Sequence, residues 1–146
     1  LPISLEFDTD CSWFRVPEPV LSQVEKKGMS PRGGLHAIEH AIISLAPFYA
    51  MCDRWDIGGF SSRNPFEEGG TIFIYDAYEG GIGIAEEFYD LLNELLKSTY
   101  ELIVDCGCEE GCPSCIYSPK CGNDNDPLDK EAAEYILNKL GERFGY

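Results

Sequence analysis

Residues 106–126, CGCEEGCPSCIYSPKCGNDND, contain five of the seven cysteines in this 146-residue chain. The five form two close pairs and a single thiol, namely Cys106 and Cys108, Cys112 and Cys115, and then Cys121. Side chains at positions i and i+2 of an extended chain point to the same side, so the first pair can meet one ion. In the second pair Pro113 favours a tight turn, which brings two thiols three positions apart to the same ion. The spacing therefore predicts a metal site within this loop.

Together the two pairs supply four thiolates, which form a closed tetrahedral shell and are a ligand set of structural zinc sites. We predict that the loop binds Zn²⁺ and that its ligands are Cys106, Cys108, Cys112 and Cys115. Because five thiols compete for four positions, Cys121 is an alternative that can replace one of these ligands. An iron–sulfur cluster uses the same ligand type and stays open as an alternative. A redox-active C-x-x-C motif fits less well, because such a motif begins a helix directly after a strand.

The composition and the cysteine count describe a globular protein in a reducing compartment. Hydrophobic residues make up 44% of the chain, and 146 residues are enough to bury a core without disulfides. Seven cysteines cannot all pair, and no basic–apolar signal segment opens the chain. The longest apolar-rich run, HAIISLAPFYAMC at residues 40–52, is too short to span a bilayer. We therefore expect a cytoplasmic protein with no membrane partner.

The net charge of −15 argues against an extended nucleic-acid-binding surface, because phosphate binding needs clustered lysines and arginines. Residues 72–87, IFIYDAYEGGIGIAEE, have the pattern of a strand, a glycine loop and a helix, which is a layout able to hold an anion at a helix N-terminus. The loop lacks the lysine and the Ser or Thr of a phosphate-binding P-loop, and its neighbours are acidic. We therefore predict a close-packing turn at residues 80–83 and no ATP site in this chain.

Residues 36–40, HAIEH, match the inverted zinc-protease pattern H-x-x-E-H. On a helix His36, Glu39 and His40 share one face, so two imidazoles and a carboxylate can meet a metal ion. These are the only histidines in the chain, so we expect any third ligand to be a carboxylate. The candidates are Asp53, Asp56 and Glu86. The competing interpretation is a buried polar cluster that satisfies backbone groups of a loop, and the shortness of the pattern favours it.

The remaining pattern predicts an α+β fold, with a small sheet packed with three main helices and a cysteine-rich zinc loop. We expect strands within residues 3–17 and 71–77, a short helix within 17–28, a helix over 35–52, a helix over about 84–104 and a last helix over 126–144. Pro47 should kink or break the second of these helices. Asp126 is the predicted N-cap of the last helix, with Pro127 at its first position.

The segments between these elements are expected to be loops, at residues 29–34 and 53–70. We divide the chain into residues 1–30, which carry the N-terminal strands and a short helix, and a zinc-binding domain over residues 31–146.

Three stretches, in this order along the chain, resemble the MrfA-type zinc-binding domain: LHAIEHAI with CDRWDIGG, then IFIYDAYEGGIGIAEE, then CGCEEGCPSCIYSPKCGN followed by PLDKEAA. This family was first described as a domain of unknown function at the C-terminal end of superfamily 2 DEAD/DEAH-box helicases. The resemblance covers roughly residues 30–140. It implies that the zinc ligands are Cys106, Cys108, Cys112 and Cys115. It gives no catalytic role to His36, Glu39 or His40.

The resemblance also implies a function. The chain would be a non-catalytic accessory domain of an ATP-dependent, 3′-to-5′ DNA helicase with a role in DNA repair. Its expected partners are the helicase motor domains of the same polypeptide and, through the parent protein, DNA. The chain begins at Leu1 rather than at a methionine, as a piece of a longer polypeptide would. The second hypothesis, from the residues alone, is a small metal-dependent hydrolase that uses His36, Glu39 and His40.

Overall fold

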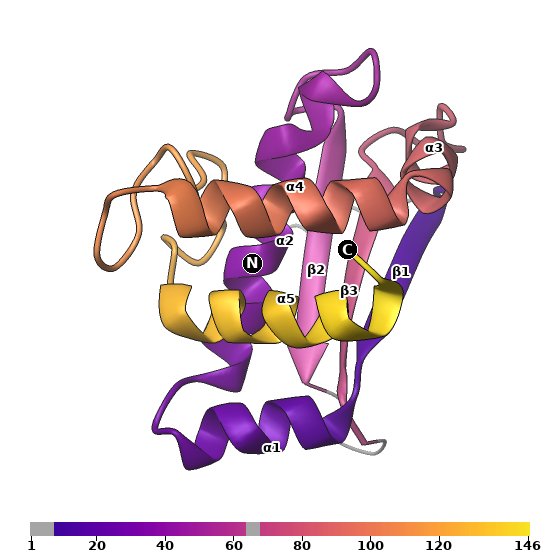
Figure 1. The fold of residues 1–146 in the computed structure, drawn as a ribbon. Coiled ribbons are helices and arrows are strands. Elements are labelled where there is room, and N and C mark those ends of the chain that lie inside the picture. Colours follow the sequence, from indigo (N-terminus) through magenta and orange to yellow (C-terminus); the bar gives the residue numbers. More distant parts are fainter. Residues whose placement is uncertain (1–7, 64–67) are drawn as a thin grey trace, which may run out of the picture.

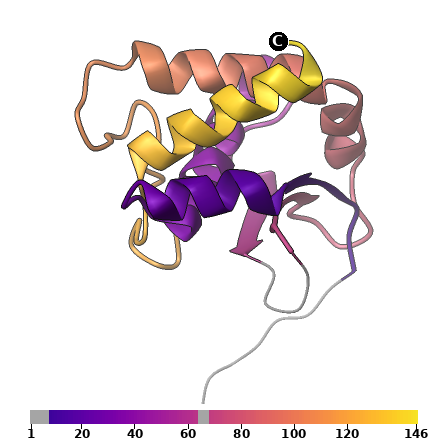
Figure 2. The same ribbon diagram turned by 60° about the horizontal axis from the view of Figure 1, so that its bottom comes forward.

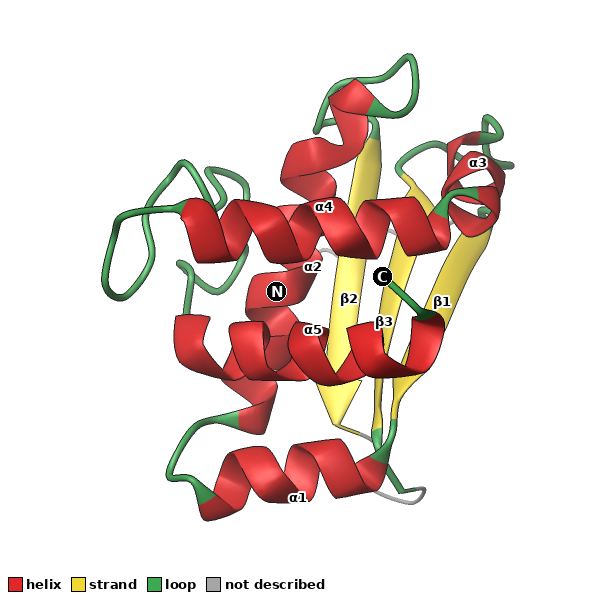
Figure 3. Cartoon of the chain, in the orientation of Figure 1, coloured by secondary structure: helices red, strands yellow, loops and turns green. Residues whose placement is uncertain are grey.

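The computed structural model describes residues 8–63 and 68–146 of the chain. In these residues the elements are, in chain order, β1 (Cys11–Val16), α1 (Glu18–Lys26), α2 (Pro31–Leu45), the short 3₁₀ helix η1 (Ala46–Phe48), β2 (Ile57–Arg63), β3 (Gly70–Asp76), α3 (Ile84–Asp90), α4 (Leu92–Asp105) and α5 (Lys130–Phe144). They form the expected α+β fold, in which a small sheet is packed with the three long helices α2, α4 and α5 (Figure 3). Within this part of the chain, no helix has both the length and the apolar character needed to cross a membrane.

Strand β3 lies at the centre of an antiparallel sheet with the order β1-β3-β2. Phe14 and Ile72 pair across β1 and β3, and their buried side chains point to the face that the helices cover. Neighbouring positions along a strand point to the opposite face, where Trp13, Phe73 and Phe60 are in register across the three strands. The rings of Phe60 and Phe73 are 6.1 Å apart. We call Trp13, Phe73 and Phe60 the aromatic row.

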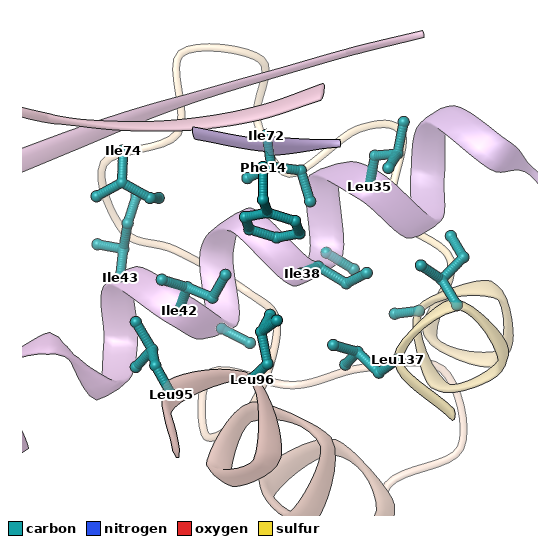
Figure 4. Close-up of a cluster of buried hydrophobic side chains, with 14 of the residues drawn as sticks. Phe14, Leu35, Ile38, Ile42, Ile43, Ile72, Ile74, Leu95, Leu96 and Leu137 are labelled. Carbon is teal, nitrogen blue, oxygen red and sulfur yellow. The ribbon is translucent and has the colours of Figure 1, made fainter. Parts of the chain in front are cut away.

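Helix α2 lies between the sheet and the pair formed by α4 and α5, so the molecule has three layers (Figures 1 and 4). Ile38 and Ile42 of α2 face Ile72 of the sheet on one side, and Leu96 of α4 and Leu137 of α5 on the other (Figure 4). All five side chains are buried. Burial of an isoleucine or leucine side chain contributes about 1.5–3 kcal/mol, so this central contact is a main source of stability.

Helices α2 and α5 approach closely because glycines face the contact. A methyl group on Gly34 would lie 2.8 Å from Cβ of Ala132, and one on Gly33 would lie 2.9 Å from Cβ of Asp129. Carbon atoms do not pack at such distances, so any larger side chain would push the two helices apart. The glycines therefore fix how near α2 comes to α5.

Asp129 ties the starts of α2 and α5 together. Its Oδ1 accepts a hydrogen bond of 3.0 Å from the Ala132 amide, which caps α5, and its Oδ2 accepts one of 2.8 Å from the Ser30 amide. The predicted N-cap at Asp126 is wrong, because Asp129 makes both contacts and α5 begins at Lys130.

The predicted loop over residues 29–34 is also wrong, because α2 begins at Pro31. The Ser30 hydroxyl accepts a 2.9 Å hydrogen bond from the Gly33 amide, and proline is well suited to the first helical position. The two glycines weaken helix propensity, but their burial against α5 outweighs that cost.

The predicted loop over residues 53–70 contains strand β2, which pairs with β3. Glycine has a low strand propensity, so Gly58 and Gly59 prevented a strand from being predicted here. Side chains pack closely on both positions, and a Cβ at Gly58 would lie 2.4 Å from Cζ of Tyr75, so that ring would have to shift. A Cβ at Gly59 would lie 2.7 Å from Cγ of Glu39. Tight packing on both faces therefore explains why a strand lacks strand-forming residues here.

The predicted helix over residues 84–104 is two helices, α3 and α4, which meet at Leu91. The break lets α3 lie against β1 while α4 crosses α2 and runs beside α5 (Figure 1). The short helix α1, the strand β3 and the break at Pro47, which lies within η1, are confirmed. In the predicted N-terminal strands, residues 11–16 form β1, and residues 3–7 lie outside the described residues.

Candidate metal centres

Residues 106–129 form a loop that leaves α4 and returns to α5, at the end of the molecule away from α3 (Figures 1 and 2). Four of its thiols, which we call the cysteine cluster, have sulfur atoms that all lie within 4.8 Å of one another: Cys106, Cys108, Cys112 and Cys115. Cys115 is buried, and Ile116 beside it belongs to the hydrophobic core. The loop is therefore anchored in the core at its middle as well as at its ends.

The spacing of the four sulfurs fits a tetrahedral metal ion. Cys106 Sγ lies 3.5 Å from the sulfurs of both Cys108 and Cys112. Cys115 Sγ lies 3.6 Å from that of Cys108 and 3.8 Å from that of Cys112. Zinc–sulfur bonds of about 2.3 Å at tetrahedral angles place ligand sulfurs about 3.8 Å apart. A disulfide would need about 2.05 Å, so the geometry suits zinc and not disulfide bonds.

A tight backbone turn brings the second pair of thiols together. The amides of Cys115 and Tyr117 both donate to the carbonyl of Cys112, at 3.0 and 3.1 Å. Gly111 has a φ of 124°, which only glycine adopts readily, and a Cβ there would meet Ile116 at 2.6 Å. The tight turn expected from the spacing is therefore present and held by local hydrogen bonds.

Lys130, the first residue of α5, places its charge against the cysteine cluster. Its Nζ donates to the carbonyls of Cys106 and Cys108, at 2.9 and 2.6 Å, and lies 3.2 Å from Cys108 Sγ. Burial opposes the charged form, but the hydrogen bond to Cys108 and the nearby thiols raise the pKa of Lys130. A tetrathiolate zinc site has a net charge of about −2, so this ammonium offsets part of it.

The pKa values of two thiols in the cluster are shifted in opposite directions. Desolvation raises the pKa of Cys108, but hydrogen bonds from Lys130 and the neighbouring thiols outweigh it and lower that pKa to about 6. Burial raises the pKa of Cys115 to about 12. Metal binding requires thiolates, so an ion that binds here displaces the remaining thiol protons into solvent.

Cys121 lies apart from the cysteine cluster, beside the two histidines of α2. Its Sγ is 3.5 Å from Nε2 of His36, and one ligand atom from each of His36, His40 and Cys121 lies within 4.8 Å of the other two. We call these three residues the histidine cluster. The fifth thiol, expected as a substitute in the four-sulfur shell, thus occupies a different site.

The third partner of the histidines was expected to be a carboxylate, and the structure supplies a thiol instead. Among the described residues, none of Asp53, Asp56 and Glu86 joins the histidines in a group of metal-binding type. Only the fold brings the 116–127 segment back against α2, so the spacing of the sequence contained no signal for this contact.

Both histidines bond to backbone carbonyls of the 106–129 loop, as the buried-polar-cluster interpretation expected. Nδ1 of His36 lies 2.7 Å from the carbonyl of Pro127, and Nδ1 of His40 lies 2.7 Å from that of Ile116. Burial lowers the pKa of His40 to about 4, which favours the neutral ring. Burial likewise raises the pKa of Glu39 to about 7, against the effects of a hydrogen bond with Ser61 and the charge of Lys120.

A cavity of about 560 Å³ opens beside the histidine cluster, between α2, the edge strand β2 and the 118–127 segment. His36, His40 and Cys121 all line it, together with Glu39 and Lys120. Lys120 donates to the carbonyl of Ile57, which ties the loop to the start of β2.

The backbone amides of the glycine loop between β3 and α3 donate hydrogen bonds to the side chain of Asp76. Asp76 is fully buried, and its Oδ2 accepts hydrogen bonds from the amides of Ile82 and Gly83, at 2.6 and 2.9 Å. Its Oδ1 accepts one of 2.8 Å from the Ala85 amide. The amides that could have held a phosphate are thus occupied, which agrees with the predicted close-packing turn.

The model of the MrfA Zn-binding domain family matches residues 38–116, over half of the chain. This range includes the cysteine cluster but neither His36 nor Cys121. The uncharacterized protein MJ1572.1 of Methanocaldococcus jannaschii is 47% identical over 110 residues, which are 73% of this chain and 98% of that protein. The uncharacterized ATP-dependent helicase YprA of Bacillus subtilis is 41% identical over 83 residues, which are 56% of this chain and 11% of that helicase.

A crystal structure of the DUF1998 helicase MrfA bound to DNA has a similar fold. It superposes with a TM-score of 0.65 at 30% sequence identity, over 95% of this chain and 18% of that chain. The chain thus spans nearly the whole of the archaeal relative, but less than a fifth of the two helicases.

Proposed function

The chain belongs to the MrfA Zn-binding domain family, and from that premise we propose that it is a non-catalytic, zinc-stabilised accessory domain of an ATP-dependent DNA helicase. The observation that carries the proposal is the close grouping of four sulfurs in the loop between α4 and α5, at separations that suit a tetrahedral zinc ion. The proposed zinc ligands are Cys106, Cys108, Cys112 and Cys115. A role in DNA repair, which rests on the family, and a cytoplasmic location, which rests on the odd number of cysteines, are parts of the same proposal.

The zinc ion would act as a cross-link. Four bonds to one ion would fix the loop between the end of α4 and the start of α5, and Lys130 would hold the charged centre against α5. Ile116 and Cys115 carry this order into the core. The domain would therefore present a rigid surface to the rest of the helicase.

The net charge and the sequence motifs favour an accessory role over a catalytic one. No P-loop motif occurs in the 146 residues, and the amides at the start of α3 already bind Asp76. With a net charge of −15, the chain would bind DNA weakly by itself, and salt would weaken that binding further. We therefore assign ATP hydrolysis and most DNA contacts to the motor domains.

The aromatic row offers a surface for those motor domains, which we place in the same polypeptide. Trp13 and Phe60 are 55% and 58% exposed, and with Phe73 they form an apolar strip on the sheet face opposite α2. Exposed apolar strips of this kind are typical of interfaces. In the MrfA structure the matching region is 18% of a much longer chain, so a domain of this family can have such a neighbour.

Two assays test the proposal. The isolated domain should show no ATPase, peptidase or nuclease turnover above that of a variant in which His36→Ala and Glu39→Ala are combined. Turnover that disappears in the double variant would replace the accessory domain with the metal-dependent hydrolase.

The second assay uses the helicase that contains the domain. Cys108→Ser combined with Cys115→Ser should reduce DNA unwinding while leaving nucleotide binding unchanged, because the cluster supports the motor and is not part of the ATP site. Cys11→Ser is the matched control, since this exposed thiol lies outside both clusters. Equal unwinding by the double variant and the control would contradict the proposal.

A further inference from the structure

The histidine cluster has the separations of a metal site as well as the right side chains. A tetrahedral zinc ion with bonds of about 2.3 Å to sulfur and about 2.05 Å to nitrogen places these two ligand atoms about 3.6 Å apart. Cys121 Sγ and His36 Nε2 are 3.5 Å apart, and the atom from His40 completes a group within 4.8 Å. A hydrogen bond between thiol and imidazole would explain the first distance, but not the approach of a second imidazole to the same sulfur.

The hydrogen bonds of the two histidines orient their rings for metal binding. A carbonyl oxygen only accepts, so Nδ1 of His36 carries the proton that it donates to Pro127, and Nδ1 of His40 donates likewise to Ile116. In the neutral ring the lone pair is then on Nε2. Metal-binding histidines characteristically donate their other nitrogen to a carbonyl or carboxylate, which fixes the tautomer and the ring orientation.

The fold holds these groups in place before any ion arrives. His36 and His40 lie one turn apart on α2, are 9% and 5% exposed, and have ring centroids 4.2 Å apart. Each ring is fixed by a carbonyl of the loop that also carries Cys121. Little side-chain freedom remains to be lost on binding, so the site is preorganised.

We propose that His36, His40 and Cys121 form a second metal site, which binds Zn²⁺ or a similar borderline divalent transition ion. Two imidazoles and one thiolate suit such ions and not Mg²⁺ or Ca²⁺, which prefer oxygen. On binding, the Cys121 thiol loses its proton to solvent, and the two neutral imidazoles coordinate without losing one. The site shares no ligand with the cysteine cluster, and it does not depend on any role in a helicase.

The second site differs from the first in having three protein ligands. All three line the cavity of about 560 Å³, which leaves room for a water molecule or another small ligand at the fourth position. A site with an open position exchanges its ion more readily than a closed shell of four thiolates. We therefore expect a chelator to remove the second ion first.

The test is metal content and spectroscopy of the whole chain, reloaded with Zn²⁺ or Co²⁺ under reducing conditions. The wild-type chain should bind two ions, and Cys121→Ser should bind one, with a loss of sulfur-to-cobalt charge-transfer intensity. Cys52→Ser is the matched control, because this partly buried thiol belongs to neither cluster, and it should retain two ions. Circular dichroism would establish that each variant is folded.

Two outcomes would overturn the second site. One is a single ion in both the wild-type chain and Cys121→Ser, and the other is two ions in both. If Cys121→Ser loses both ions or unfolds, Cys121→His decides the matter, because an imidazole can replace the thiolate as a ligand. That variant should bind two ions with the absorption of a nitrogen-rich second site, and fewer than two would refute the proposal.

Discussion

The two clusters use similar side chains but are built from very different lengths of chain. The cysteine cluster takes all four thiols from residues 106–115, and the hydrogen bonds of its turn are local. The histidine cluster joins α2 to Cys121, a residue 85 positions beyond His36. The first therefore needs mainly its own loop, whereas the second needs α2, α5 and the loop to be correctly packed. Removing a thiol of one cluster and disturbing the packing of α2 against α5 should therefore affect the two clusters differently.

The largest effect is expected when a ligand of the cysteine cluster is removed. Cys115→Ser should lower the free energy of unfolding by more than about 3 kcal/mol, because loss of a structural metal is among the few single changes of that size. Cys115 is also buried in the core. Thermal melts of the zinc-loaded proteins would measure the change. Cys11→Ser is the control, and equal melting temperatures would show that the cysteine cluster does not hold the domain together.

A smaller effect, directed at the histidine cluster, is expected from Asp129→Ala. The variant loses the cap of α5 and the hydrogen bond to Ser30, at a cost of about 1–3 kcal/mol. It should weaken the second metal site much more than the first, because the four thiols of the first all lie within one loop, whereas the second depends on how α2 meets α5. Chelator titration would resolve the two ions. Glu134→Ala, a substitution of an exposed residue on the same helix, should change the affinity of neither site. Equal weakening of both sites would contradict the expected difference between the two clusters.

The smallest effect is expected from Lys130→Met, which keeps most of the buried side chain and removes the charge near Cys108. The fold should survive, and zinc affinity of the cysteine cluster should fall about tenfold, the lower end of the range for outer-shell partners. Competition with a chromophoric chelator measures this. Lys139→Met, farther along α5, is the matched control. An unchanged affinity would mean that Lys130 supports only the two carbonyls to which it donates.

The same contrast decides what could be predicted from the sequence. The cysteine cluster could be predicted because its thiols are closely spaced and its turn depends on local residues. Strand β3 could be predicted because its residues favour strands. Strand β2 was missed because Gly58 and Gly59 are chosen for the side chains packed on them. The position of Cys121 was missed because no local pattern encodes a contact across 85 residues.

The ends of helices followed the same rule. Asp126 and Asp129 are both plausible caps by residue type, and α5 starts after Asp129 because that carboxylate also reaches Ser30, 99 positions earlier. The start of α2 at Pro31 depends on glycines that fit only against α5. Local propensity left several choices open at these places, and tertiary packing selected one.

The span of the Asp129 contact also bears on the order in which the molecule assembles. Bringing together residues 99 positions apart costs about 2 kcal/mol more in loop-closure entropy than closing the ten residues of the cysteine cluster. Contacts of short range form early in folding, and contacts of long range form late. The four thiols can therefore bind an ion while the rest of the chain is still largely unfolded. The histidine cluster comes into being only once α2 and α5 have docked, so its occupancy would report that folding is complete.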